Sequence, residues 1–473
     1  MADQGTATAK GPAKLKAVTE LVEKLTEDLD KITLLPKARN GALEALKVYG
    51  REPEYADPIF TQEGISMLLR HSFHSPSGET ARAALRVLAN AMLLKPETRQ
   101  MFVDQAFAAR ACSELKTENW DNEFLISRIL FLSTYGTDVN LEDLITNHHL
   151  ADRIVDNLAR HAKLATSKFK SKTKQPMEDM ALSETLKLLF NVTHFCKDEA
   201  AKFDGAVPHI VTLFWRQDIP TTKPLEAPFG PLVNALLNME LSTERSQAAV
   251  YPQKPDPNKV ALRLIDLLDK SMKAYTGNDL ETVVTPVFSL LGKVHEHAPP
   301  PVRQRIRTML LPTAEDRKSV LGRGDTLSAK ILKNSTNPTA PALREAISQL
   351  LFDMSDKDAS KFVENVGYGF ASGFLFQNNV PIPTSASEAF STGDPSGAQR
   401  PVNPITGQFL DEESIKEGPA LSQAEKEREA ERLFVLFERL KQNGIIDIQN
   451  PVEAAIREGR FREIPEDEVE ELE

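Results

Sequence analysis

The sequence predicts an all-α protein: an armadillo/HEAT-like right-handed superhelical repeat solenoid, followed by a flexible linker and a tethered C-terminal helix. A short apolar pattern recurs along most of the chain, its apolar residues have helical spacing, and no convincing run of alternating apolar and polar residues is present. Aromatic residues make up 7% of the chain, with only 2 Trp and 6 Tyr, which is few for a strand-rich protein.

The recurring pattern is centred on one small or polar residue, which we call the anchor. Leu lies two residues before the anchor in all six clear copies, and an apolar residue lies five before it in every copy except the one with Ser348. The anchors are Asn90, Thr134, Asn191, Asn238, Gly292 and Asp353, and a weaker first copy is centred on Tyr49. Successive anchors lie roughly 41 to 61 residues apart, close to the period of armadillo and HEAT repeats with insertions.

Each anchor stretch predicts a helix with one apolar stripe that it cannot cover alone. Stacked helices bury these stripes in one continuous core and leave a concave face. Asn has a low helix propensity, so we expect the side chains of Asn90, Asn191 and Asn238 to form interactions that offset it. Their amides either bind the backbone of a partner on the concave side, or they bond neighbouring repeats and local carbonyls. The sequence leaves both possibilities open.

The remaining segments complete the expected organisation. We expect a disordered N-terminus at residues 1–13, the solenoid at 14–380, a flexible linker at 381–421, and an amphipathic helix with an acidic tail at 422–473. Five prolines and many small polar residues between 381 and 407 predict the linker.

The last predicted helix begins with Ser422 as its cap and runs to about residue 442, where Asn443 and Gly444 follow. Its apolar side carries Leu433, Phe434, Leu436, Phe437 and Leu440. Such a helix can fold back on the repeats or dock on a partner, and the sequence permits either.

Charge and composition exclude several classes of function. Of the net charge of −11, residues 411–473 hold −10, so the rest is near −1 and lacks the basic excess of a nucleic-acid-binding protein. No run of 18 apolar residues predicts a membrane-spanning helix. Two cysteines, Cys112 and Cys196, suit a reducing compartment, and we expect a cytoplasmic protein.

No motif indicates catalysis, a cofactor or a metal. The Gly367-Tyr368-Gly369 stretch lacks both the preceding strand and the glycine spacing of a dinucleotide loop. His295 and His297 are two residues apart, which places them on different sides of a helix. Cys196 and His194 are close in sequence, but no oxyanion loop accompanies them. We therefore expect no catalytic residue, no cofactor and no metal site.

Taken together, several stretches resemble the synembryn family, whose name in full is resistance to inhibitors of cholinesterase. They are FLISRILFLSTYGTDV, ETLKLLFNVTH, PLVNALLNM, KFVENVGYGFASGFL, NPITGQFLDEE and the last helix, in this order. The resemblance covers about residues 40 to 450 and rests on the order and spacing of these stretches.

The resemblance implies a non-receptor guanine nucleotide exchange factor and folding chaperone for α subunits of heterotrimeric G proteins. Such a protein binds the GDP form, promotes GDP release and holds the empty α subunit until GTP binds. It would take the C-terminal helix of the α subunit into the concave groove and contact the nucleotide-binding domain through the tethered helix.

The resemblance also assigns partner-binding residues, each against a purely structural alternative. Asn90, Asn191 and Asn238 stand at groove positions, and Arg128 and Lys187 on the same helices are possible carboxylate clamps. On the tethered helix the partner-binding residues are Phe434, Phe437 and Leu440. The two basic residues can instead be merely solvated, and the two Phe residues can pack within the protein itself.

Two further expectations complete the prediction. Ser385 and Ser391 each precede an acidic residue by three positions and are candidate phosphorylation sites, although the segment is nearly neutral. We expect a monomer. A peptide-binding armadillo scaffold or adaptor without any effect on nucleotide exchange is the alternative function.

Overall fold

The computed structural model describes residues 9–166, 176–381, 390–393, 399–403 and 406–413. By internal contacts the chain divides into Met1–Glu412 and Glu413–Glu473, so nearly all of the described residues belong to the first unit. Residues 422–473, with Phe434, Phe437 and Leu440, lie outside the described residues, and so does Ser385.

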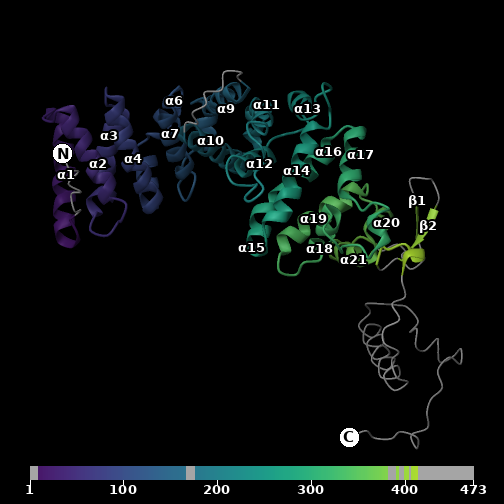
Figure 1. Cartoon of the computed structure of the whole chain (residues 1–473). Coiled ribbons are helices and arrows are strands. Elements are labelled where there is room, and N and C mark those ends of the chain that lie inside the picture. The colour runs from purple at the N-terminus through teal and green to yellow at the C-terminus, as the bar shows by residue number, and fades with distance from the viewer. Residues whose placement is uncertain (1–8, 167–175, 382–389, 394–398, 404–405, 414–473) are drawn as a thin grey trace, which may run out of the picture. The chain divides into compact units, whose positions relative to one another are not determined.

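The first unit consists of short helices that follow one another along the chain (Figure 1). They are α1 (Gly11–Lys31), α2 (Pro36–Tyr49), α3 (Gln62–Phe73), α4 (Gly78–Leu94), α5 (Glu97–Asp104), α6 (Ala108–Glu114), α7 (Trp120–Ser133), α8 (Leu141–Thr146), α9 (Leu150–Thr166), α10 (Pro176–Phe195), α11 (Ala206–Leu213), α12 (Phe229–Leu237), α13 (Glu244–Val250), α14 (Lys259–Ala274), α15 (Gly277–Asp279), α16 (Thr285–His297), α17 (Pro300–Leu310), α18 (Leu327–Ser335), α19 (Pro341–Met354), α20 (Ala359–Val366) and α21 (Tyr368–Gln377).

The predicted repeat corresponds to one continuous series of packed helices. Each anchor lies on, or directly after, one of seven helices, which we call the anchor helices: α2, α4, α7, α10, α12, α16 and α19. Each anchor helix packs against the next one in this order. The six Leu residues that precede the anchors are all buried: Leu88, Leu132, Leu189, Leu236, Leu290 and Leu351. The all-α repeat fold is therefore confirmed.

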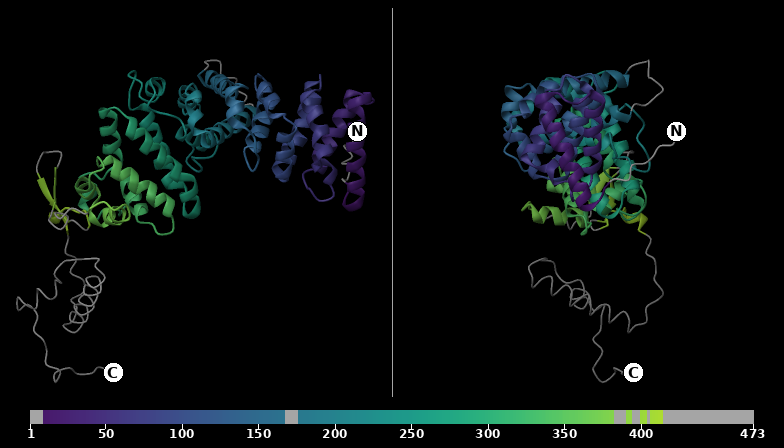
Figure 2. Two further views of the ribbon diagram at one scale, coloured as in Figure 1. Left: turned by 180° about the vertical axis from the view of Figure 1, so that it is seen from behind. Right: turned by 90° about the vertical axis from the view of Figure 1, so that its left-hand side faces the viewer.

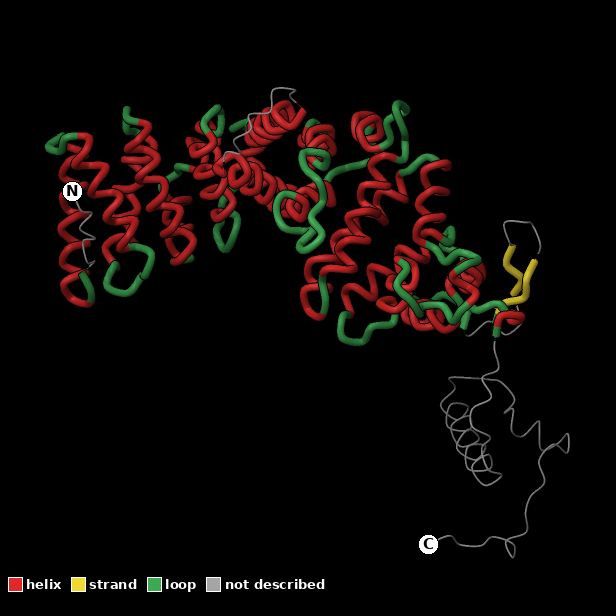
Figure 3. Tube along the Cα trace, viewed as in Figure 1, coloured by secondary structure: helices red, strands yellow, loops and turns green. Residues whose placement is uncertain are grey.

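Other helices cover the anchor helices and complete the core. Helix α3 packs on α4, α9 on α11, and α14 on α16. On α14, one stripe with helical spacing is buried while charged residues occupy the rest of the helix, as amphipathic packing requires. Figure 2 shows the stacked helices from behind and from one side, and Figure 3 shows that helix dominates the described residues.

Helix boundaries follow local capping chemistry. The Asn119 side chain accepts a hydrogen bond from the backbone N–H of Asn122 at 3.0 Å and begins α7. Thr61 caps α3 in the same way. Pro36 stands at the first position of α2, where a missing N–H costs nothing.

The structure differs from the prediction at both ends of the solenoid. Helix α1 begins at Gly11, within the stretch 1–13 that was expected to be disordered. Part of the expected flexible linker is folded: β1 (Phe390–Gly393) pairs antiparallel with β2 (Gln399–Val402), and Val402 and Phe409 are buried. The composition of this segment predicted flexibility throughout. A few buried contacts are nevertheless enough to hold part of a polar, proline-rich segment in one conformation.

Candidate partner-binding surface

Helices α7 and α10 bring together the two basic residues that the sequence singled out. The Oε1 atom of Glu184 lies 3.4 Å from Nη1 of Arg128 and 2.9 Å from Nζ of Lys187. The Glu184 side chain is only 5% exposed, whereas that of Lys187 is 44% exposed. Two cations share one carboxylate, so among the residues that the structure describes one positive charge remains uncompensated and can attract an anionic group.

Aromatic side chains surround these charges. Phe131 on α7 packs edge to face with Tyr135, which follows the end of this helix, with the ring centroids 5.2 Å apart, and Phe190 stacks on His194 on α10 at 5.9 Å. The Lys187 ammonium lies 6.0 Å from the Phe131 centroid. Lys187, Phe190 and His194 stand at i, i+3 and i+7 on α10 and form one stripe, and Arg128 and Phe131 have the spacing i, i+3 on α7. We call the set the α7–α10 surface: Arg128, Phe131, Tyr135, Lys187, Phe190 and His194.

The anchor asparagines differ in what their amides do. Asn191 is 4% exposed, and its Nδ2 donates to Oγ1 of Thr134 at 2.7 Å. The Nδ2 of Asn238 donates to the carbonyl of Phe190 at 3.0 Å. Both amides thus connect one anchor helix to the preceding one, which favours the structural alternative for these two residues. Asn90 is half-buried, and no described residue forms a hydrogen bond with its side chain.

A buried ionic network lies beneath the α7–α10 surface. Glu123 on α7 is fully buried, and its carboxylate accepts hydrogen bonds from Thr185 (2.7 Å) on α10 and from Arg160 on α9. The Nε2 atom of His161 lies 2.9 Å from Oε1 of Glu123. Burial alone would raise the pKa of Glu123, but these hydrogen bonds and the nearby positive charge outweigh it and leave the pKa lowered. The network fixes three helices against one another.

Sequence reasoning missed Glu184, Glu123 and Lys293. Glu184 stands three residues before Lys187, a spacing that predicts an ion pair on a helix. Lys293 Nζ donates to the carbonyls of Leu237 and Met239, at the end of α12. No local sequence pattern predicts such a contact between repeats.

The residues that were rejected as catalytic lie in unreactive surroundings. Burial raises the pKa of the Cys196 thiol, and the charges of Glu142 and Glu199 raise it further, so the nucleophilic thiolate is disfavoured. Gly367 has φ +87° and separates α20 from α21. Within the described residues, no three His, Cys, Asp or Glu side chains gather as metal ligands, and no helix is long and apolar enough to cross a membrane.

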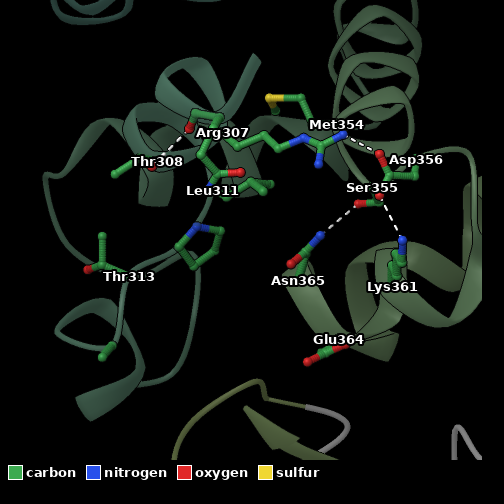
Figure 4. Close-up of a pocket in the computed structure, with 13 residues that line it drawn as sticks. Arg307, Thr308, Leu311, Thr313, Met354, Ser355, Asp356, Lys361, Glu364 and Asn365 are labelled. Carbon is green, nitrogen blue, oxygen red and sulfur yellow. Dashed lines mark hydrogen bonds and ion pairs between the residues drawn. The ribbon is translucent and has the colours of Figure 1, made fainter. Parts of the chain in front are cut away.

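A polar cavity of about 810 Å³ lies away from this surface, between α17 and α20. Asp356 pairs with Arg307 and, at 2.8 Å, with Lys361, and Asn365 donates to Ser355 at 3.0 Å (Figure 4). Asp356 pairs with both of the cations that line the cavity, and none of the predicted partner-binding residues lines it.

Comparison with known families decides which family these features belong to. The family model described as guanine nucleotide exchange factor synembryn matches residues 42–460, which is most of the chain. The chain belongs to the synembryn family. This is a family of exchange factors and chaperones rather than of catalytic enzymes.

Individual synembryn-family relatives are distant but match over nearly their whole length. A synembryn-like chaperone of Schizosaccharomyces pombe is 26% identical, over 88% of this chain and 82% of the relative. Chaperone Ric-8A of Xenopus tropicalis is 24% identical, over 91% of this chain and 86% of the relative. Among solved structures, an engineered protein covers 73% of this chain with 16% identity and a TM-score of 0.42.

Proposed function

We propose that this chain is a non-receptor guanine nucleotide exchange factor and folding chaperone for α subunits of heterotrimeric G proteins. It binds the GDP form, promotes GDP release and stabilises the nucleotide-free state until GTP binds. Membership of the synembryn family supports exchange and chaperone activity in general, and the α7–α10 surface is the observation that supports a specific binding mode.

The α7–α10 surface suits the C-terminal helix of an α subunit. A half-exposed aromatic stripe can cover the apolar face of a helix, and the uncompensated charge near Lys187 can meet a carboxylate. We place Arg128, Lys187 and Asn90 in this contact. Asn191 and Asn238 support it indirectly, because their amides hold the anchor helices in register.

The exchange mechanism needs only differential binding. A protein that binds the empty α subunit more tightly than the GDP-bound one must weaken GDP binding by the same factor. A thousandfold weakening requires about 4 kcal/mol of differential binding free energy, which an extended surface can supply. Removing the C-terminal helix of the α subunit from its own core would loosen the neighbouring guanine-binding loop. The same contact would shelter that helix before nucleotide is bound.

The remaining parts of the proposal rest on the sequence. Phe434, Phe437 and Leu440 would contact the nucleotide-binding domain, and Ser385 and Ser391 stay candidate phosphorylation sites. Ser391 belongs to β1. We expect the protein to act in the cytoplasm, as a monomer, without cofactor or metal.

A charge reversal tests the binding mode. In Lys187→Glu the cation is replaced by a carboxylate next to Glu184, so affinity for a C-terminal α-subunit peptide should fall at least tenfold, with slower GDP release. Lys273→Glu is the matched control, because Lys273 is also exposed and also paired with one acidic residue, Asp269, but lies on α14. Peptide affinity can be measured by fluorescence anisotropy and GDP release with a fluorescent nucleotide.

The same experiment distinguishes an exchange factor from a peptide-binding scaffold without any effect on nucleotide exchange. If the unaltered protein binds the peptide but leaves GDP release from the purified α subunit unchanged, the scaffold alternative is correct. If Lys187→Glu and Lys273→Glu bind the peptide equally well, the α7–α10 surface is not the binding site.

A further inference from the structure

The segment before residue 414 is attached to the last repeats by several specific contacts. Phe409 is 1% exposed, and its backbone N–H donates to the carbonyl of Arg317 at 2.9 Å. The backbone N–H of Leu321 donates to the carbonyl of Thr406 at 3.0 Å. Arg400 lies over the Phe409 ring at 4.0 Å and pairs with Asp411 at 2.6 Å. We call residues 399–413 the docking segment.

Arg317 is the central contact of the docking segment. It is only 5% exposed, and its Nη1 donates to the carbonyl of Gly407 at 2.9 Å. Its Nη2 donates to the carbonyls of Glu364 (2.8 Å) and Asn365 (2.9 Å) at the end of α20. Within the described residues it forms no ion pair, so its direct contacts are backbone carbonyls, while the charges of Glu364 and Asp316 favour its protonated form from farther away. Losing the Gly407 carbonyl would leave part of the guanidinium unsatisfied, which makes the arrangement specific.

Gly407 fits this contact because it lacks a side chain. Its φ is +66°, and a Cβ atom there would lie 2.4 Å from Cδ1 of Leu321. A larger residue would therefore both strain the backbone and push the docking segment away from Leu321. The contact depends on residues 90 positions apart in the sequence, Arg317 and Gly407.

We propose that Arg317 and Gly407 are positioning residues, which fix on the last repeats the point where residues 414–473 begin. This inference rests on the proposed function, in which a second contact with the α subunit is made by the helix expected from residue 422. With the docking segment attached, the 8 residues 414–421 precede that helix. With it released, the chain that precedes the helix starts at residue 381 and is 41 residues long. Effective concentration falls with about the −3/2 power of length, so the second contact should weaken about tenfold.

Substitution of Gly407 in the full-length protein is the first test. Gly407→Val should increase hydrogen exchange in residues 399–413 and slow GDP release about tenfold, while affinity for the C-terminal α-subunit peptide stays unchanged. Gly324→Val is the matched control, because Gly324 also has a positive φ (+98°) but has open space around its Cα. It should leave residues 399–413 and GDP release as in the unaltered protein.

A chain insertion tests positioning separately from folding. Inserting 33 Gly/Ser residues after Glu413 lengthens the free chain by the same amount and leaves Arg317 and Gly407 untouched. We expect the same roughly tenfold slowing of GDP release, now with normal hydrogen exchange in residues 399–413.

Distinct outcomes overturn this inference and the proposed function. If the insertion leaves GDP release at full rate, or if Gly407→Val releases residues 399–413 without slowing it, Arg317 and Gly407 have no positioning role. Unchanged hydrogen exchange in Gly407→Val would show that Gly407 does not hold the docking segment, which also contradicts the inference. If the unaltered protein does not accelerate GDP release at all, the proposed function fails, whatever the exchange pattern of residues 399–413.

Discussion

Buried charged residues carry much of the specificity at the scale of single residues. Glu123 is fully buried yet ionised, because Arg160, His161 and Thr185 surround its carboxylate. Removing charges from water is costly, and the pairing of this carboxylate offsets part of that cost, although Nε and Nη1 of Arg160 and Nδ1 of His161 have no hydrogen-bond partner among the described residues. The network therefore favours one arrangement of α7, α9 and α10 over other equally apolar ones.

The Glu123 network should be essential for stability. Glu123→Gln leaves the partly buried Arg160 guanidinium without its ion-pair partner, so the free energy of unfolding in urea denaturation should fall by about 3 kcal/mol, the lower end of the range for a buried pair. Glu114→Gln removes a glutamate from an exposed pair with Arg110 and should change it by less than about 0.5 kcal/mol. Similar losses in the two variants would mean that Glu123 is not ionised.

His295 should make stability depend on pH. Burial, together with the charges of Arg307 and Arg303, lowers the pKa of His295 from its usual 6.5 to about 4, against the opposing effect of Asp356. The unfolded chain binds a proton below about pH 6.5 and the folded protein only near pH 4. Stability should therefore fall as pH drops from 6.5 to 4, by about 3 kcal/mol from this residue.

His295→Gln should reduce that pH dependence in urea denaturation. In this variant the free energy of unfolding should still fall at low pH, but by less, because the pKa values of His71 and His209 are also lowered by burial. Identical pH profiles for the variant and the unaltered protein would show that His295 is accessible to protons when folded.

At the scale of elements, neighbouring anchor helices are joined by polar contacts at the anchors. Asn191 reaches Thr134, Asn238 reaches the carbonyl of Phe190, and Lys293 reaches the carbonyls that end α12. Each contact spans consecutive anchor helices. Apolar stripes alone would allow the helices to slide, whereas a buried amide is satisfied in only one register.

The anchors should therefore differ in their effect on stability. Asn191→Ala should lower the free energy of unfolding by about 1–3 kcal/mol, because it removes the buried amide that donates to the Thr134 hydroxyl and leaves a small cavity between two anchor helices. Asn90→Ala should change it by less than about 0.5 kcal/mol, because the Asn90 amide bonds no described residue. The measurement is urea denaturation. Peptide affinity should instead respond to Asn90→Ala, and equal stability losses at both positions would contradict this assignment.

At the scale of the whole molecule, the helical repeat is an independent unit. Internal contacts separate Met1–Glu412 from Glu413–Glu473, and the docking segment closes the first unit at its C-terminal end. Each repeat contacts mainly its neighbours, so stability accumulates along the stack.

Removal of residues 414–473 should leave this unit folded. We expect the melting temperature to change by less than about 2 °C and the C-terminal α-subunit peptide to bind as before, because no docking contact is lost. GDP release should slow strongly, since only one of two proposed contacts remains. Earlier melting together with lost peptide binding would show instead that residues 414–473 belong to the core of the repeats.

Much of the fold could be predicted because its signal is local. The spacing of Leu88, Leu132 and the other Leu residues before the anchors reports helix period and burial directly. The candidate site was predicted only in part. Arg128 and Lys187 were named through the family resemblance and stay predictions, whereas Glu184 between them, and the internal bonds of Asn191 and Asn238, depend on which helices become neighbours.

The sequence by itself determined the all-α repeat, the family and the position of the acidic C-terminal region, because periodicity, order of motifs and charge are properties of the linear chain. Only the tertiary structure decided which polar residues face inward and that residues 399–413 are attached to the repeats. The physical reason is distance along the chain. Arg317 and Gly407 meet across 90 residues, and a buried hydrogen bond of that kind leaves no local pattern in the sequence.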